Sequence, residues 1–265
     1  MLFRWIGHSE FRKHEQLIGV MYDAGISTLD QLSVLTGWTH GVVKNLIARI
    51  RHMKAEGDDK DSWIKVMIIK QATTDKSATK RATAYTLGLR GMAYVHAMMR
   101  DDMKYRESPE GQAMHFIGTN EILVRLLKSG MDRQRLKWLT STEATDVLVM
   151  YFEEIKKELE RRTFIRPDAY LSIGEKWFWI EYDNDTERTR KLERKFHNYV
   201  QTLIPVPNAS PDPVVWVCPT TQRRDYLQDQ WQMVVELFYQ SRKIPHMHFF
   251  TNGEDTDFFH KIIND

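Results

Sequence analysis

A β-hairpin in the second half of the chain constrains the fold more than any other segment. Two apolar runs, Ala169–Ile173 and Trp177–Tyr182, are rich in branched and aromatic residues and are separated by a turn around Gly174. Helical patterns precede and follow them, and further strand-like runs lie at 135–139 and 214–218. This alternation predicts a mixed sheet covered by helices.

Three carboxylates are placed at one end of this hairpin. Asp168 begins the first run, and Glu181 and Asp183 finish the second. Strand alternation and antiparallel pairing predict that they converge. Like charges this close repel unless a cation neutralises them, and clustered carboxylate oxygens suit Mg²⁺ or Mn²⁺. A metal ion held there could activate water for attack on a phosphodiester. The alternative is that these are strand-end carboxylates in solvent or caps of the next helix.

A lysine on the following helix is predicted to reach the same place. That helix runs to about Thr202 and turns an apolar stripe inward, which includes Leu192 and Tyr199. Lys195 lies between these two residues, at the edge of the stripe, so its ammonium could extend over the sheet end toward the carboxylates. The alternative is a lysine whose stem covers apolar surface while its charge stays in water.

The first hundred residues have a different pattern. Helical spacing predicts helices at 8–23, 28–36 and 41–54, and branched residues predict strands at 63–70 and 82–88. The second and third helices are separated by a turn at Gly37–Trp38, and the third is longer and basic. Helix, turn, basic helix and hairpin in this order predict a winged helix-turn-helix.

The third helix and the loop between the strands carry residue types that contact DNA. Such side chains reach base edges or phosphates from the major groove, and a basic wing tip suits phosphates or the minor groove. The predicted contacts are Thr39, His40, Lys44, Asn45 and Arg49 on the helix and Lys76, Lys80 and Arg81 in the loop. The alternatives are a winged helix used for protein contacts and a solvated loop.

The two parts of the chain differ in charge, which suggests that they have different functions. The formal net charge is only +2, but residues 1–104 hold 16 Lys and Arg against 11 Asp and Glu, whereas the remainder holds 22 against 25. A polar stretch with Pro109 and Gly111 predicts a linker at 105–113. We therefore expect an α+β or α/β protein with a DNA-binding domain at 1–104 and a mixed-sheet domain at 114–265.

The cellular compartment is inferred from three features that the sequence does not show: a disulfide framework, a signal peptide and a membrane span. A single cysteine, Cys218, excludes an internal disulfide framework. The N-terminal residues do not form a signal peptide, and no apolar run approaches the ~18 residues needed to span a bilayer. We expect a cytoplasmic protein without a membrane partner.

The hairpin and its flanking helices resemble the core of the PD-(D/E)XK nuclease superfamily. The resemblance implies a Mg²⁺- or Mn²⁺-dependent DNA endonuclease in which Asp168 and Glu181 ligate the metal and Asp183 assists as ligand or base. Glu121 matches an acidic position on the first helix and joins the expected metal ligands. Asp183 stands where the superfamily has its lysine. Some members place that lysine on the following helix, which nominates Lys195 to steady the attacking water or the phosphate. Its loss from the usual position equally implies lost cleavage.

The whole chain is similar to the replication-relaxation family over roughly residues 10–250. The similarity rests on the winged helix-turn-helix, the His115–Glu121 segment, "RPDA", "E-x-D-x-x-TE" from Glu181, and Lys195 with Tyr199. It implies a double-stranded DNA-binding protein of a plasmid or mobile element of Gram-positive bacteria. Such a protein would act in plasmid replication, DNA relaxation or mobilisation, as a homodimer or with other plasmid replication or relaxation proteins.

Two further functions are compatible with the sequence. A winged-helix transcriptional repressor would use the second half as a non-catalytic dimerisation or effector module. A scaffold in a relaxation complex would bind partner proteins tightly and DNA weakly. Whether the second half cuts DNA or holds it without cutting is left open by the residues alone.

Overall fold

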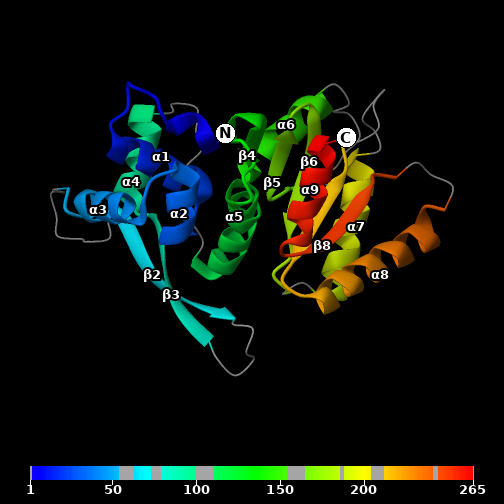
Figure 1. Ribbon diagram of the computed structural model, residues 1–265. Helices are drawn as coiled ribbons and strands as arrows, with labels where there is room; N and C mark the ends of the chain where they lie inside the picture. The colour runs from blue at the N-terminus through cyan, green and yellow to red at the C-terminus, as the bar shows by residue number, and fades with distance from the viewer. Residues whose placement is uncertain are drawn as a thin grey trace. The chain divides into compact units, whose positions relative to one another are not determined.

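The protein has a mixed helix-and-sheet, α+β fold. The computed structural model describes residues 2–53, 63–72, 79–99, 110–153, 165–185, 188–203, 212–240 and 244–264. The chain divides into two compact units, Met1–Gly130 and Met131–Asp265 (Figure 1). Among the described residues, no helix combines the length and the apolar character that crossing a membrane requires.

Three short helices, α1 (Lys13–Ala24), α2 (Leu29–Thr36) and α3 (His40–Arg51), form the first part of unit 1, after a 3₁₀ turn at Leu2–Trp5. Gly37, with φ of +73°, ends α2 in the left-handed conformation that the predicted turn requires. The three helices pack through fully buried side chains: Leu17, Ile18, Leu32, Leu35, Val43 and Ile50.

Threonine caps fix where α2 and α3 begin. Thr28 Oγ1 accepts a hydrogen bond from the backbone N–H of Gln31 at 3.2 Å, and Thr39 Oγ1 accepts one from Val42 at 3.4 Å. Each cap satisfies a backbone donor that the first helical turn would leave unpaired.

Unit 1 also contains a three-stranded antiparallel sheet. The helix α4 (Leu89–Tyr94) follows its last strand and continues as a π-helical segment, Val95–Met99. The strands β1 (Ser27–Thr28), β2 (Ile64–Ala72) and β3 (Thr79–Leu87) pair in the order β1-β3-β2.

The β2–β3 hairpin is longer than the sequence analysis expected. The register pairs Lys70 with Arg81 and Gln71 with Lys80. Lys80 and Arg81 therefore belong to β3 and not to the loop, because the antiparallel ladder continues through this polar stretch. Lys76 lies outside the described residues.

Helix α5 (Ala113–Lys128) belongs to unit 1, whereas the sequence analysis placed it at the start of the second domain. The buried Asn120 side chain explains the difference, because its Nδ2 donates to the carbonyl oxygens of Ala24 at 2.9 Å and Ile26 at 3.1 Å. Asn120 thus ties α5 to the turn between α1 and β1. Residues 105–109 of the predicted linker are not among the described residues.

In the described part of unit 2, five strands form a mixed sheet in the order β4-β5-β6-β7-β8. The pairs β4–β5 and β5–β6 are antiparallel, and β6–β7 and β7–β8 are parallel. The predicted hairpin is confirmed, with its turn at Gly174 (φ +62°). The strands are β4 (Leu136–Thr140), β5 (Ala169–Ile173), β6 (Lys176–Tyr182), β7 (Val214–Cys218) and β8 (Met247–Thr251).

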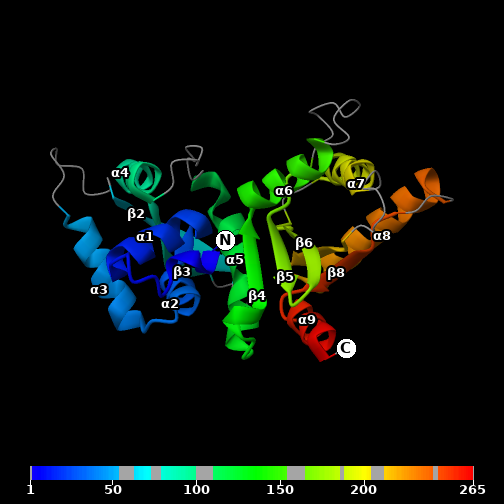
Figure 2. The same cartoon turned by 90° about the horizontal axis from the view of Figure 1, so that it is seen from above.

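Helices cover both faces of this sheet. Figure 2 shows α6 (Ser141–Glu153) and α7 (Thr189–Leu203) on one side of the strands and α9 (Glu254–Asn264) on the other. Helix α8 (Thr221–Phe238) packs against α7 and β8. The main core lies on the α7 side and includes Tyr170, Trp179, Leu192, Phe196, Tyr199 and Trp216. Neither β1 nor α9 was predicted from the sequence.

Candidate functional site

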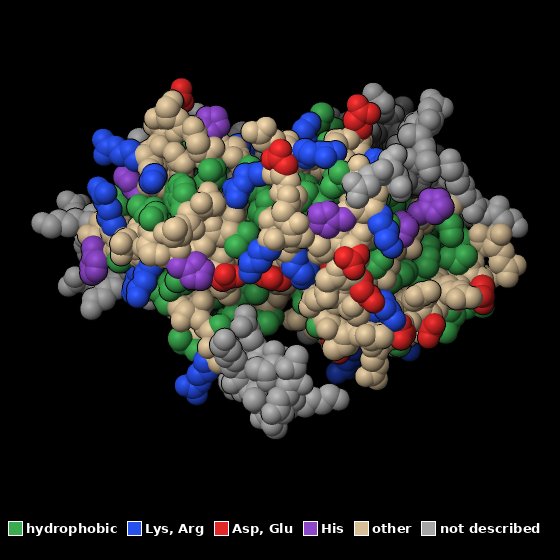
Figure 3. All heavy atoms as spheres, in the orientation of Figure 1, with side chains coloured by type: hydrophobic (Ala, Val, Ile, Leu, Met, Phe, Trp, Pro, Cys, Tyr) green, Lys and Arg blue, Asp and Glu red, His purple; other side chains and the backbone are tan. Residues whose placement is uncertain are grey.

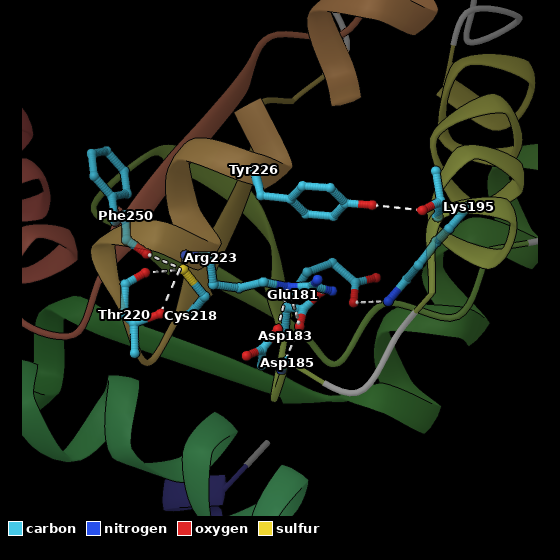
Figure 4. Close-up of polar contacts among 10 residues, drawn as sticks. Glu181, Asp183, Asp185, Lys195, Cys218, Thr220, Arg223, Tyr226 and Phe250 are labelled. Carbon is cyan, nitrogen blue, oxygen red and sulfur yellow. Dashed lines mark hydrogen bonds and ion pairs between the residues drawn. The ribbon is translucent and has the colours of Figure 1, made fainter. Parts of the chain in front are cut away.

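The centre of the candidate site is Glu181, near the end of β6. Its side chain is fully buried and points to the α7 side of the sheet. Lys195 Nζ donates to Glu181 Oε2 at 2.7 Å (Figure 4), and the Tyr199 hydroxyl donates to Oε1. Both donors come from α7, one helical turn apart, so they reach the same carboxylate. The predicted approach of Lys195 to the hairpin carboxylates is confirmed.

The protonation of Glu181 is shaped by opposing effects. Burial raises the pKa of this carboxyl from its ordinary range to about 8, because the charged form loses its hydration. The positive charge of Lys195 lowers the pKa, and the negative charge of Asp168 raises it. Lys195 also lies over the ring of Trp216, 4.8 Å from its centroid, which holds the ammonium beside the sheet.

Asp168 lies beside Glu181, as antiparallel pairing of the two strands predicts. Its backbone N–H donates to Ile180 O at 3.0 Å, and its Oδ2 accepts from the backbone N–H of Tyr182 at 2.7 Å. The carboxylate therefore fastens the start of β5 to the end of β6.

Asp183 follows β6 and forms a buried ion pair with Arg223. The Nη2 and Nε atoms of Arg223 donate to Asp183 Oδ2 at 2.8 Å and Oδ1 at 3.2 Å. Arg223 lies in the first turn of α8, where Thr220 Oγ1 accepts from its backbone N–H at 3.2 Å. Its Nε also lies 3.3 Å from Asp185 Oδ1. The two-pronged geometry is what a guanidinium and a carboxylate favour.

Sequence reasoning missed two residues of this site. Tyr199 was recognised as inward-facing and as part of a family motif, but not as a partner of Glu181. Arg223 was not among the predicted site residues. Thr220 could have indicated the position of Arg223 in the sequence. It is a threonine cap directly after β7, and because β7 runs parallel to β6, the first turn of the next helix lies at the same end of the sheet as the end of β6.

Two of the three hairpin carboxylates are already engaged by protein groups. Both oxygens of Glu181 and both oxygens of Asp183 accept hydrogen bonds from Lys195, Tyr199 and Arg223. Across the described residues, no group of three or more His, Cys, Asp or Glu side chains could hold a metal ion. The binding of Mg²⁺ or Mn²⁺ stays a prediction.

Glu121, the fourth expected metal ligand, belongs to α5 of unit 1. Its Oε2 accepts from Gln31 Nε2 at 2.9 Å, and the same amide group donates to Ile117 O at 2.8 Å. In unit 1 this glutamate therefore helps to join α5 to α2.

The predicted DNA-contacting residues of α3 share one exposed face. Thr39, His40, Lys44, Asn45 and Arg49 are all exposed, and Val43, Ile47 and Ile50 are buried on the opposite side. His40 Nε2 lies 3.3 Å from Asp30 Oδ1. Figure 3 shows Lys and Arg side chains over the part of the surface that carries α1 and α3. Arg81 on β3 is also exposed.

Fold and site together define an α+β protein in which unit 1 presents a basic helix face and unit 2 contains carboxylates paired with cationic side chains. The model of the replication-relaxation family matches residues 19–204, and the chain belongs to that family. The match covers α3, Asp168, Glu181 and Lys195, and it ends before Arg223. Neither curated proteins nor solved structures gave a match. Family membership suggests a role in the replication or relaxation of a plasmid or mobile element.

Proposed function

We propose that this protein binds duplex DNA through α3 and acts in the replication or relaxation of a plasmid or other mobile element. The observation that carries the proposal is the exposed face of α3, which combines Lys44, Asn45 and Arg49. The chain has no acidic residue between Gly37 and Met53, so nothing on this helix repels a phosphate.

The surrounding elements support this use of α3. Three helices followed by an antiparallel hairpin, with β1 pairing against β3, is the order that a winged helix-turn-helix requires. In such domains the helix after the turn enters the major groove. Arginine and asparagine can then read base edges, and lysine can bind phosphates.

In the proposed function, unit 2 does not hydrolyse DNA. The order of hairpin, helix and parallel strand, with Asp168, Glu181 and Lys195 side by side, agrees with the resemblance to the PD-(D/E)XK superfamily. Both oxygens of Glu181 and both oxygens of Asp183 are hydrogen-bonded to protein groups. We therefore assign these carboxylates a structural role, in which they fasten α7 and α8 to the end of the sheet.

The DNA-binding proposal is tested with Lys44→Ala and Arg49→Ala combined in the full chain. Each side chain that binds a phosphate or a base edge is worth about 1–3 kcal/mol, so we expect affinity for duplex DNA to fall about a hundredfold or more. Fluorescence anisotropy with labelled duplex at several salt concentrations measures the decrease.

Lys176→Ala with Lys261→Ala is the matched control, because it removes two exposed positive charges from unit 2. This control should bind nearly as the wild type does. If the α3 variant kept wild-type affinity at low salt, the assignment of α3 would be wrong. Tight metal-independent binding confined to inverted repeats would instead favour a transcriptional repressor.

A second test asks whether unit 2 cuts. Supercoiled plasmid incubated with the protein and Mg²⁺ or Mn²⁺ is expected to remain supercoiled, because the Glu181 and Asp183 oxygens are already paired. Agarose electrophoresis against the Glu181→Ala variant provides the readout. Open circles from the wild type but not from the variant would overturn the non-cutting role and establish metal-dependent hydrolysis.

A further inference from the structure

Helix α7 concentrates positive charge on a unit that is otherwise acidic. Residues 131–265 contain 19 Lys and Arg against 22 Asp and Glu, yet residues 187–195 contain five basic and two acidic residues. Four of the basic side chains are exposed: Arg188, Arg190, Lys191 and Arg194. The fifth, Lys195, is engaged with Glu181 and is not part of this surface.

The exposed basic residues lie away from the core. Leu192, Phe196 and Tyr199 are fully buried and fix the inner face of α7 against the sheet. Arg190 and Arg194 are four residues apart, so they project one turn apart from the outward side, about 6 Å along the helix axis. Figure 2 shows that α7 lies on one side of the sheet and α9 on the other, which leaves the outward side of α7 turned from the strands.

The placement of these charges is unfavourable for the dipole of the helix. Positive side chains are favourable near the C-terminal end of a helix and unfavourable near its N-terminal end. The first turn of α7 contains Arg190 and Lys191 and no acidic residue, and its last turn contains no basic residue. The buried inner face already accounts for the stability of α7. An exposed cationic face that opposes the helix dipole therefore favours an anionic partner.

We propose that the outward face of α7, defined by Arg190, Lys191 and Arg194, together with Arg188 just before the helix, is a second DNA-binding surface that contacts backbone phosphates. Guanidinium groups bind phosphate oxygens in pairs, and contacts of this kind carry no sequence information. The inference rests on the proposed function, since it adds a second contact with the same kind of ligand. Through this surface unit 2 holds DNA while α3 supplies the sequence preference.

The test is the Arg190→Ala/Arg194→Ala variant of the full chain, measured on duplex DNA by fluorescence anisotropy over a range of salt. We expect affinity to fall by a similar factor for every duplex sequence. The slope of log K against log salt should become shallower by about 1 for each phosphate that the variant no longer neutralises, or about 2 in total. Arg190→Lys/Arg194→Lys should restore most of the slope, because it restores the charge.

The Lys176→Ala/Lys261→Ala variant controls for charge, and circular dichroism controls for folding. Wild-type affinity and slope in the α7 variant, together with abolished binding in the Lys44→Ala/Arg49→Ala variant, would overturn this inference and leave the proposed function standing. Wild-type binding by both variants would instead overturn the proposed function. An equal decrease in the charge control would show that the effect is not specific to α7, and this also overturns the inference.

Discussion

Lys195→Met is expected to lower the free energy of unfolding by about 3 kcal/mol at pH 9, because it removes the cation that faces a fully buried carboxylate. The Lys195 side chain retains 26% exposure, which places the effect at the lower end for a broken buried ion pair. Urea unfolding followed by circular dichroism measures the difference.

The destabilisation should depend on pH in a defined direction. Burial raises the folded-state pKa of Glu181 to about 8, above an unfolded value of about 4.3. The stability that this carboxyl contributes is therefore fully present below about pH 4.3 and is lost as pH rises through about 8. Without Lys195 the folded pKa rises further, so the destabilisation should be clearly smaller at pH 5 than at pH 9.

Two comparisons show whether the pairing is responsible. Lys191→Met removes an exposed lysine one turn earlier on α7 and should change stability little. Glu181→Gln combined with Lys195→Met leaves no buried charge to compensate and should recover much of the stability. An equal destabilisation at both pH values, or no recovery in the double variant, would contradict the role of the pair.

Arg223→Met is expected to lower the free energy of unfolding by about 3–5 kcal/mol, because it leaves the buried Asp183 carboxylate without its two-pronged partner. Chemical denaturation of the full chain measures the difference. Hydrogen exchange should show the first turn of α8 opening more readily, since Arg223 joins this turn to the end of β6.

The neighbouring arginine provides a matched control. Arg224 pairs with Asp225 and Glu254, at 2.7 Å in each case, but these partners lie in solvent. Ion pairs in water contribute little to stability, so Arg224→Met should leave unfolding nearly unchanged. Similar destabilisation in both variants would show that burial is not the deciding factor.

Much of this fold follows from local patterns. The hairpin at Ala169–Tyr182 was predicted from branched and aromatic residues on either side of Gly174, and its antiparallel register placed Asp168 beside Glu181. Thr28 and Thr39 fix where α2 and α3 begin, because a capping residue acts on the backbone two or three positions away. The position of Lys195 relative to the apolar stripe of α7 predicted its reach toward the carboxylates.

Other features depended on contacts between distant segments. The polar sequence around Lys80 and Arg81 is typical of a loop, but the ladder with β2 extends the strand through it. The amphipathic pattern of α5 is compatible with either unit. The hydrogen bonds of Asn120 to the α1–β1 turn place this helix in unit 1.

The sequence by itself determined the class of fold, the exposed basic face of α3 and the placement of Asp168 beside Glu181. These depend on periodicity, capping and strand pairing, which act over a few residues or across one turn. Only the tertiary structure decided what the carboxylates face. Tyr199 and Arg223 come from α7 and α8, and burying a carboxylate stabilises the fold only when side chains from such neighbouring elements supply its hydrogen bonds and its opposite charge.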